Sequence, residues 1–155
     1  MSYTRTPGWL ALVVASCAVP AAGLAAPCAG TNINHTVTWS PTEIGKGGKL
    51  SILRFTSVIV SDDPGAPFHL ASGECVGSFL FGPDGKIMLE SGYCARQDKD
   101  GDVLNEEWFG GGGGKGTSKV VGGTGKFANS RWSFNWQHTA LRAPTAAVRW
   151  SGDCR

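Results

Sequence analysis

The stretch from Val120 to Phe127 constrains the fold more than any other part of the sequence. It reads Val-Val-Gly-Gly-Thr-Gly-Lys-Phe, so two β-branched residues are followed by three glycines within four positions. Glycine adopts the positive φ angles that tight turns require, and β-branched residues favour extended strands. The stretch therefore predicts a strand that ends in a tight turn.

The sequence after residue 26 repeats this pattern of short runs separated by turn residues. The clearest strand is 131–138, where Trp132, Phe134, Trp136 and His138 alternate with polar residues and so give one aromatic and one polar face. Further strands are expected at 34–40, 49–60, 74–81, 86–97, 103–109, 117–121 and 146–150, with the longest loop at 61–73 and a glycine-rich loop at 110–116. These short segments and turns predict an all-β fold, an eight-stranded antiparallel up-and-down barrel.

Residues 1–26 are expected to be a secretory signal peptide, followed by a single barrel domain at 27–155. Arg5 is the only charged residue before a run of Leu, Val, Ala and other small residues, as is typical of such signals. The run is too short for a membrane span, and Pro20 and Gly23 interrupt it. We therefore expect a secreted or periplasmic protein, with lipid attachment at Cys17 or a retained anchor as alternatives.

The charge distribution and the spacing of possible metal ligands argue against nucleic-acid and metal partners. Without Arg5, 13 basic residues (14 minus 1) balance 12 acidic residues, and the charges are spread along the chain. Phosphate binding needs clustered Lys or Arg, so no nucleic-acid partner is expected. His35, His69 and His138 lack zinc-site spacing, and the acidic turn at 98–102 lacks the downstream Glu of a calcium loop. The sequence predicts neither a metal nor a cofactor.

Four cysteines follow the predicted signal peptide, and an even number in an exported chain predicts two disulfides. Asp84-Gly85 is expected to be the centre of a hairpin turn, so residues whose numbers sum to 169 should face each other. Cys75 and Cys94 meet this condition. Cys28 and Cys154 remain, and their disulfide would join the two chain ends where a barrel closes.

The same arithmetic assigns strand faces. A turn centred on Asp100-Gly101 pairs residues that sum to 201, which places Tyr93 opposite Trp108 and Ala95 opposite Glu106. One face of the three strands then carries Glu74, Val76, Leu80, Ile87, Leu89, Ser91, Tyr93, Leu104, Glu106 and Trp108. This face has more apolar side chains than the face with the predicted disulfide, so it is expected to line the lumen.

The expected lumen combines an apolar wall with a few polar groups. The predicted ligand-binding residues are Trp108, Trp132, Phe134, Trp136, His138 and Glu74. A carboxyl group in such a pocket is expected to have a raised pKa, and a neighbouring phenol could share its proton. Glu106 and Tyr93 are therefore the candidate catalytic residues. In the alternative interpretation, Glu106 lies at the rim and Tyr93 is a core residue with a satisfied hydroxyl.

The sequence Gly-Gly-Thr-Gly-Lys-Phe at 122–127 resembles the turn that recurs in small β-barrels related to allene oxide cyclase and the dirigent proteins. The resemblance implies a barrel that acts without a cofactor on a hydrophobic small molecule, as an isomerase, cyclase or lyase. It transfers no catalytic residue, because only the turn matches. A non-catalytic carrier of an apolar ligand, and a barrel filled by its own aromatic residues, remain as alternatives.

Overall fold

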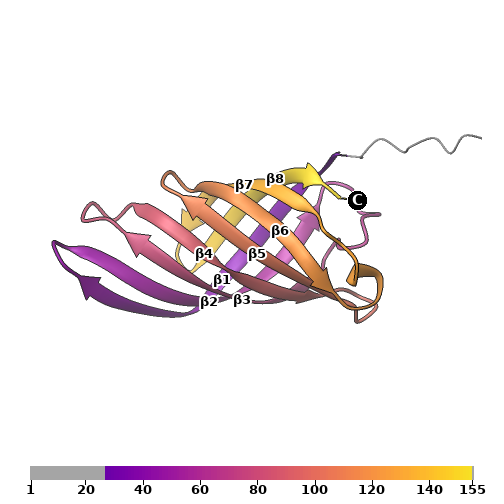
Figure 1. Ribbon diagram of the computed structural model, residues 1–155, viewed down its shortest axis with the longest axis horizontal. Helices are drawn as coiled ribbons and strands as arrows, with labels where there is room; N and C mark the ends of the chain where they lie inside the picture. Colours follow the sequence, from indigo (N-terminus) through magenta and orange to yellow (C-terminus); the bar gives the residue numbers. More distant parts are fainter. Residues whose placement is uncertain (1–26, 155) are drawn as a thin grey trace, which may run out of the picture.

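A computed structural model describes residues 27–154, which form a closed barrel of eight antiparallel strands in chain order (Figure 1). The elements are β1 (Pro27–Ile44), β2 (Gly48–Ser61), β3 (Ser72–Phe81), β4 (Ile87–Gln97), β5 (Val103–Gly111), β6 (Lys115–Gly123), the 3-10 helix η1 (Gly125–Phe127), β7 (Ser133–Arg142) and β8 (Thr145–Asp153). This architecture confirms the predicted fold class. The predicted signal peptide and Cys17 lie outside the described residues.

Strand β1 is much longer than the strand predicted at 34–40. Its first part pairs with β8 from Pro27 to His35 and closes the barrel, while its pairing with β2 runs from Gly30 to Ile44. The β1–β2 hairpin therefore extends past the other strands (Figure 1). Pro41 does not end the strand, because a proline is tolerated where the outer edge of a strand has no neighbour to bond.

The glycine-rich loop predicted at 110–116 is also mostly strand. Gly110 pairs with Gly116 in the β5–β6 ladder, and the turn is confined to residues 112–114. Gly110, Gly111 and Gly116 therefore occupy strand positions, and only Gly112 to Gly114 form the turn. The longest connection is 62–71, in agreement with the predicted loop at 61–73.

One end of the barrel is closed by packed aromatic side chains. The β2–β3 loop buries Phe68, whose ring centroid lies 5.3 Å from that of Trp132 and 5.7 Å from that of Trp150. Helix η1 buries Phe127 against Trp132 at 6.0 Å. Both segments lie at the end of the barrel where the chain terminates, and the tips of the β1–β2, β3–β4, β5–β6 and β7–β8 hairpins point to the opposite end (Figure 1).

The two predicted disulfides are confirmed. Cys75 and Cys94 face each other on β3 and β4 and are bonded, and Cys28 is bonded to Cys154 across the β1–β8 seam. Two disulfides are typical of an oxidising, extracellular-type environment. Among residues 27–154, helical structure nowhere reaches the length and apolar character needed to cross a bilayer.

The predicted register between β4 and β5 is wrong by one residue. Tyr93 faces Glu107 instead of Trp108, and Cys94 faces Glu106. The turn is centred on Asp100 alone, because Asp98 N–H donates to the Asp102 carbonyl and the Asp98 carboxylate accepts from the amides of Asp100 and Asp102. A three-residue loop that ends in a left-handed glycine, Gly101 with φ 90°, replaces the expected two-residue turn.

The predicted lumen face is wrong for β3 and β4 and right for β5. Cys75 and Cys94 are buried inside the barrel, whereas Glu74 and Tyr93 lie outside. The number of apolar side chains misleads here because the inward face of β3 and β4 also carries glycines, which leave room for Trp108 from β5.

The acidic turn at 98–102 holds a lysine ammonium group. Lys126 Nζ, from η1, lies 2.6 Å from Asp98 Oδ2 and 2.5 Å from Asp100 Oδ2. Burial disfavours the charged form of Asp98, but the hydrogen bonds from Lys126 and from two backbone amides outweigh it and lower the pKa of Asp98. This ion pair joins the β4–β5 turn to the β6–β7 connection at the closed end.

Replacing Asp98→Asn is expected to lower the free energy of unfolding at pH 7 by about 1–3 kcal/mol, because it removes the more buried of the two carboxylates that pair with Lys126. The folded-state pKa of Asp98 lies below its ordinary value of 3.8, so its contribution is present above that pH and is lost as the pH falls further. Urea denaturation at several pH values should therefore show the variant and the wild type converging under acid conditions. Asp153→Asn, at an exposed site, is the control and should match the wild type throughout.

Candidate functional site

Two hollows adjoin each other inside the hairpin end of the barrel. An inner cavity of about 60 Å³ lies within the lumen, and a mouth cleft of about 380 Å³ lies between the hairpins. Both are lined by Asn34, Phe55, Phe79 and His138. These four side chains therefore form the boundary between the mouth and the interior.

The mouth cleft is mainly apolar. Its walls come from the β1–β2, β3–β4 and β7–β8 hairpins and include Trp39, Leu53, Phe81, Ile87 and Leu141. The Trp39 indole donates from Nε1 to Ser51 Oγ at 2.8 Å and packs against Phe81 at 6.4 Å, so its ring is held in place although 56% of the residue is exposed. Aromatic side chains that are ordered yet exposed at an opening are suited to contact an apolar ligand.

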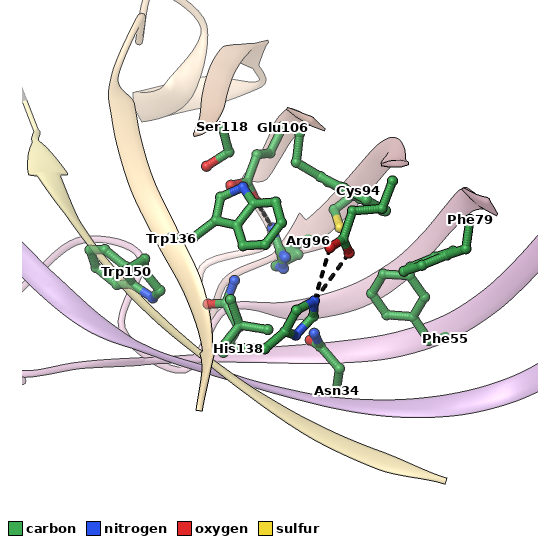
Figure 2. A pocket seen from close by; sticks show the side chains of 14 residues that line it. Asn34, Phe55, Phe79, Cys94, Arg96, Glu106, Ser118, Trp136, His138 and Trp150 are labelled. Atoms are coloured by element: carbon green, nitrogen blue, oxygen red, sulfur yellow. Dashed lines mark hydrogen bonds and ion pairs between the residues drawn. The ribbon is translucent and has the colours of Figure 1, made fainter. Parts of the chain in front are cut away.

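The inner cavity contains two buried polar pairs, one between β4 and β7 and one between the neighbouring strands β4 and β5. His138 on β7 places Nε2 3.1 Å from Glu90 Oε2 on β4, and Figure 2 shows the imidazole turned toward that carboxylate. Arg96 donates to Glu106 from Nη1 and to Ser57 Oγ from Nε and Nη2, both at 3.1 Å. Buried charges are tolerated when they are paired and hydrogen-bonded, as Arg96 and Glu106 are.

Several polar atoms of the cavity wall have no hydrogen-bond partner among the described residues. They are Trp136 Nε1, Asn32 Oδ1, Asn34 Oδ1 and His138 Nδ1, all buried and all on residues that line the inner cavity. An unsatisfied buried donor or acceptor costs roughly 1–3 kcal/mol, so native proteins rarely leave several in one place. The group therefore presents both unpaired donors and unpaired acceptors to the inner cavity.

The structure brings together only part of the predicted site. Trp108, Trp136, His138 and Glu106 line the inner cavity, and Trp132 and Phe134 lie deeper, around a space of about 20 Å³ near the closed end. Glu106 is a buried cavity residue and not a rim residue, and it is paired with Arg96.

Glu74 and Tyr93 are not part of this site. Glu74 is exposed and pairs with Arg54 at 3.0 Å. The Tyr93 hydroxyl donates to Glu107 Oε2 at 3.0 Å on the outer surface, and this carboxylate raises the pKa of Tyr93. The predicted proximity of Tyr93 to Glu106 is therefore wrong, because the two side chains lie on opposite sides of the barrel wall.

Sequence reasoning missed Glu90, Arg96, Asn32 and Asn34. Glu90 and Arg96 share the face of Cys94 on β4, and that face was expected to lie outside. The signal that could have found them is the disulfide itself, because small paired cysteines suit the inner wall of a narrow barrel. Within residues 27–154, no cluster of three or more His, Cys, Asp or Glu side chains has metal-site geometry.

The comparisons with known proteins concern the fold. No protein-family model matches the chain, and no curated protein matches its sequence. Among solved structures, the pterocarpan synthase dirigent protein GePTS1 has a TM-score of 0.50 and 15% identity, covering 82% of each chain. The pterocarpan synthase dirigent protein PsPTS1 has a TM-score of 0.49 and 14% identity, covering 82% of this chain and 92% of its own. The similarity to GePTS1 shows that the barrel has the dirigent-type fold that the turn at 122–127 implied.

Replacing Glu106→Gln is expected to lower the free energy of unfolding by about 3–5 kcal/mol, because it leaves the buried Arg96 guanidinium without a carboxylate. Glu107→Gln is the matched control. It removes only outer contacts with Tyr93 and Lys119 and should cost under about 1 kcal/mol. Urea denaturation of both variants measures the difference, and equal effects would show that the Arg96–Glu106 pair does not stabilise the lumen.

Proposed function

We propose that this is an exported protein that binds one small molecule with a largely apolar body and a polar end. The body would lie in the mouth cleft, and the polar end would enter the inner cavity. The observation that carries the proposal is the contact of an apolar cleft with a cavity in which Trp136 Nε1 and Asn34 Oδ1 are buried without partners. A hydroxyl group could accept from Trp136 Nε1 and donate to Asn34 Oδ1, and a carbonyl oxygen could accept from Trp136 Nε1 alone.

Export is supported by two independent features. The disulfides fit an oxidising compartment, and the apolar leader at 1–26 has the composition of a signal peptide. The balanced charge of the remaining chain favours a neutral small molecule over nucleic acid as the partner.

Cyclohexanone, a small ring with one carbonyl, is a suitable probe for binding. Trp136→Phe keeps an aromatic ring but removes the indole N–H, so it should weaken cyclohexanone binding about five- to tenfold in isothermal titration calorimetry. Tyr93→Phe is the control, because Tyr93 lies outside the barrel, and it should bind like the wild type. No binding to the wild type, or equal loss in both variants, would contradict a site in the lumen.

A second function, cofactor-independent isomerase, cyclase or lyase activity, is favoured by the His138–Glu90 pair. In a neutral imidazole that donates from Nε2 to the Glu90 carboxylate, Nδ1 would carry the lone pair. Nδ1 would accept a proton from the carbon beside a carbonyl, and the electron pair would move to the carbonyl oxygen. Trp136 N–H would donate to that oxygen. In a ketone with a carbon–carbon double bond next to the deprotonated carbon, the enolate is conjugated with that double bond, and return of the proton to its far carbon would move the double bond beside the carbonyl and complete an isomerisation.

Hydrogen–deuterium exchange distinguishes this activity from simple carriage. In D₂O, the wild type should accelerate exchange at the carbons beside the carbonyl of cyclohexanone, followed by NMR. Replacing His138→Gln should reduce the acceleration by about 100-fold or more, and Glu90→Gln should also reduce it, because they remove the base and the group that orients it. Tyr93→Phe should retain full acceleration. A wild type that binds cyclohexanone without accelerating exchange would be a carrier.

A further inference from the structure

The tryptophans of the lumen lie against glycines of neighbouring strands. Trp108 faces Gly92, which faces Gly77, and these three residues form one row across β5, β4 and β3. Trp136 likewise faces Gly116, which faces Gly110, across β7, β6 and β5. Each indole therefore has two glycines beside it in its own row.

These positions are glycine because the indole rings occupy the space of a Cβ atom, and not because the backbone needs a positive φ angle. Gly77, Gly92, Gly110 and Gly116 are absent from the residues of the barrel with positive φ, so the backbone there would accept other residues. A Cβ atom on Gly77 would lie 2.5 Å from Cζ2 of Trp108, and one on Gly110 would lie 2.5 Å from Cη2 of Trp136. Glycine weakens a strand interior, and a close approach by another group is a recognised reason to keep it.

Gly110 lies between two groups of the proposed site. It is the cross-strand partner of Glu90, and a Cβ atom at this position would be 2.9 Å from Glu90 Cγ as well as 2.5 Å from Trp136. Trp136 also packs edge-on against His138, with ring centroids 5.4 Å apart. A side chain at position 110 would therefore have to displace the indole, the carboxylate or both.

We propose that Gly110 is a specificity-determining residue, which sets the size of the ligand that reaches the His138–Glu90 pair by letting the Trp136 indole lie against the barrel wall. This inference rests on the proposed binding function. The inner cavity is only about 60 Å³, so an indole displaced into it would exclude larger ligands first. Gly77 likewise lets the Trp108 indole lie against the barrel wall.

The choice of variants follows from what a new Cβ would meet. At Gly92 and Gly116 it would lie 2.2 Å and 2.0 Å from a carbonyl oxygen, so substitution there strains the backbone. At Gly110 the three nearest atoms belong to side chains, and Gly110→Ala therefore acts on the cavity wall. Gly111→Ala is the matched control, because a Cβ at Gly111 would have no atom within 4 Å.

The experiment compares cyclohexanone with 2-decalone, a two-ring ketone, in isothermal titration calorimetry of the folded variants. We expect Gly110→Ala to bind 2-decalone about tenfold or more weakly than Gly111→Ala, with a smaller loss for cyclohexanone. Adding Gly110→Ala to Trp136→Phe should cost little further affinity, because the smaller ring no longer meets the methyl group. The Trp136 indole N–H resonance, identified by its loss in Trp136→Phe, should shift in Gly110→Ala and not in Gly111→Ala.

The outcomes separate this inference from the binding function. If the wild type binds neither ketone, the binding function fails, and an unshifted indole resonance in Gly110→Ala would overturn the packing argument by itself. If the wild type binds and Gly110→Ala binds 2-decalone as well as Gly111→Ala does, the specificity role fails while the binding function stands. Should Gly110→Ala not fold, Gly77→Ala with Ser78→Ala as control repeats the test through Trp108, because a Cβ at Gly77 would meet the Trp108 ring at 2.5 Å and the Ser91 carbonyl oxygen less closely, at 2.9 Å. Failure of both glycine variants to fold would assign these glycines to stability and overturn the proposal.

Discussion

The narrow bore of the barrel is the constraint on which the rest of the structure depends. Eight strands enclose an interior just wide enough for packed side chains or one small ligand. The Trp108 side chain fits inside because its neighbours Gly77 and Gly92 are glycines and leave space for the indole. The inward face is therefore a mixture of very large and very small residues, and the outward face can carry more aliphatic side chains than the interior.

This constraint explains which parts of the structure could be predicted from the sequence. Turn chemistry and alternation predicted the strands, and the Asp84-Gly85 turn correctly paired Cys75 with Cys94. Two errors followed from assumptions that local sequence does not test. The face of β4 was chosen by its number of apolar side chains, and the β4–β5 turn was centred half a residue too late, which shifts the pairing by one residue, because the Asp98 side chain reshapes the turn.

A shift of one residue inverts the faces of a strand, so the two errors cancelled on β5 and not on β4. Glu106 and Trp108 were placed in the lumen for the wrong reason, and Tyr93 was placed there incorrectly. Glu90 was missed because it lies on the face of β4 that was expected to point outward. The core-lining aromatic residues of β7 were recognised because their alternation needs no register. The polar residues Glu90, Arg96 and Glu106 could not be assigned correctly from the sequence, because their position depends on the face of β4 and on its pairing with β5.

The two ends of the barrel differ: the closed end carries stabilising contacts, and the hairpin end carries the cleft of the proposed ligand site. At the closed end, the Cys28–Cys154 disulfide, the Lys126 ion pairs and the packed rings of Phe68 and Phe127 hold the loops to the strands. At the hairpin end, Trp39 and other apolar residues stay exposed around an opening. A buried ion pair such as Arg96–Glu106 contributes little net stability compared with apolar residues of similar volume, so its presence in so small a lumen fits the proposed ligand site better than a purely structural role. The architecture thus anchors the barrel at one end and leaves the charged interior accessible from the other.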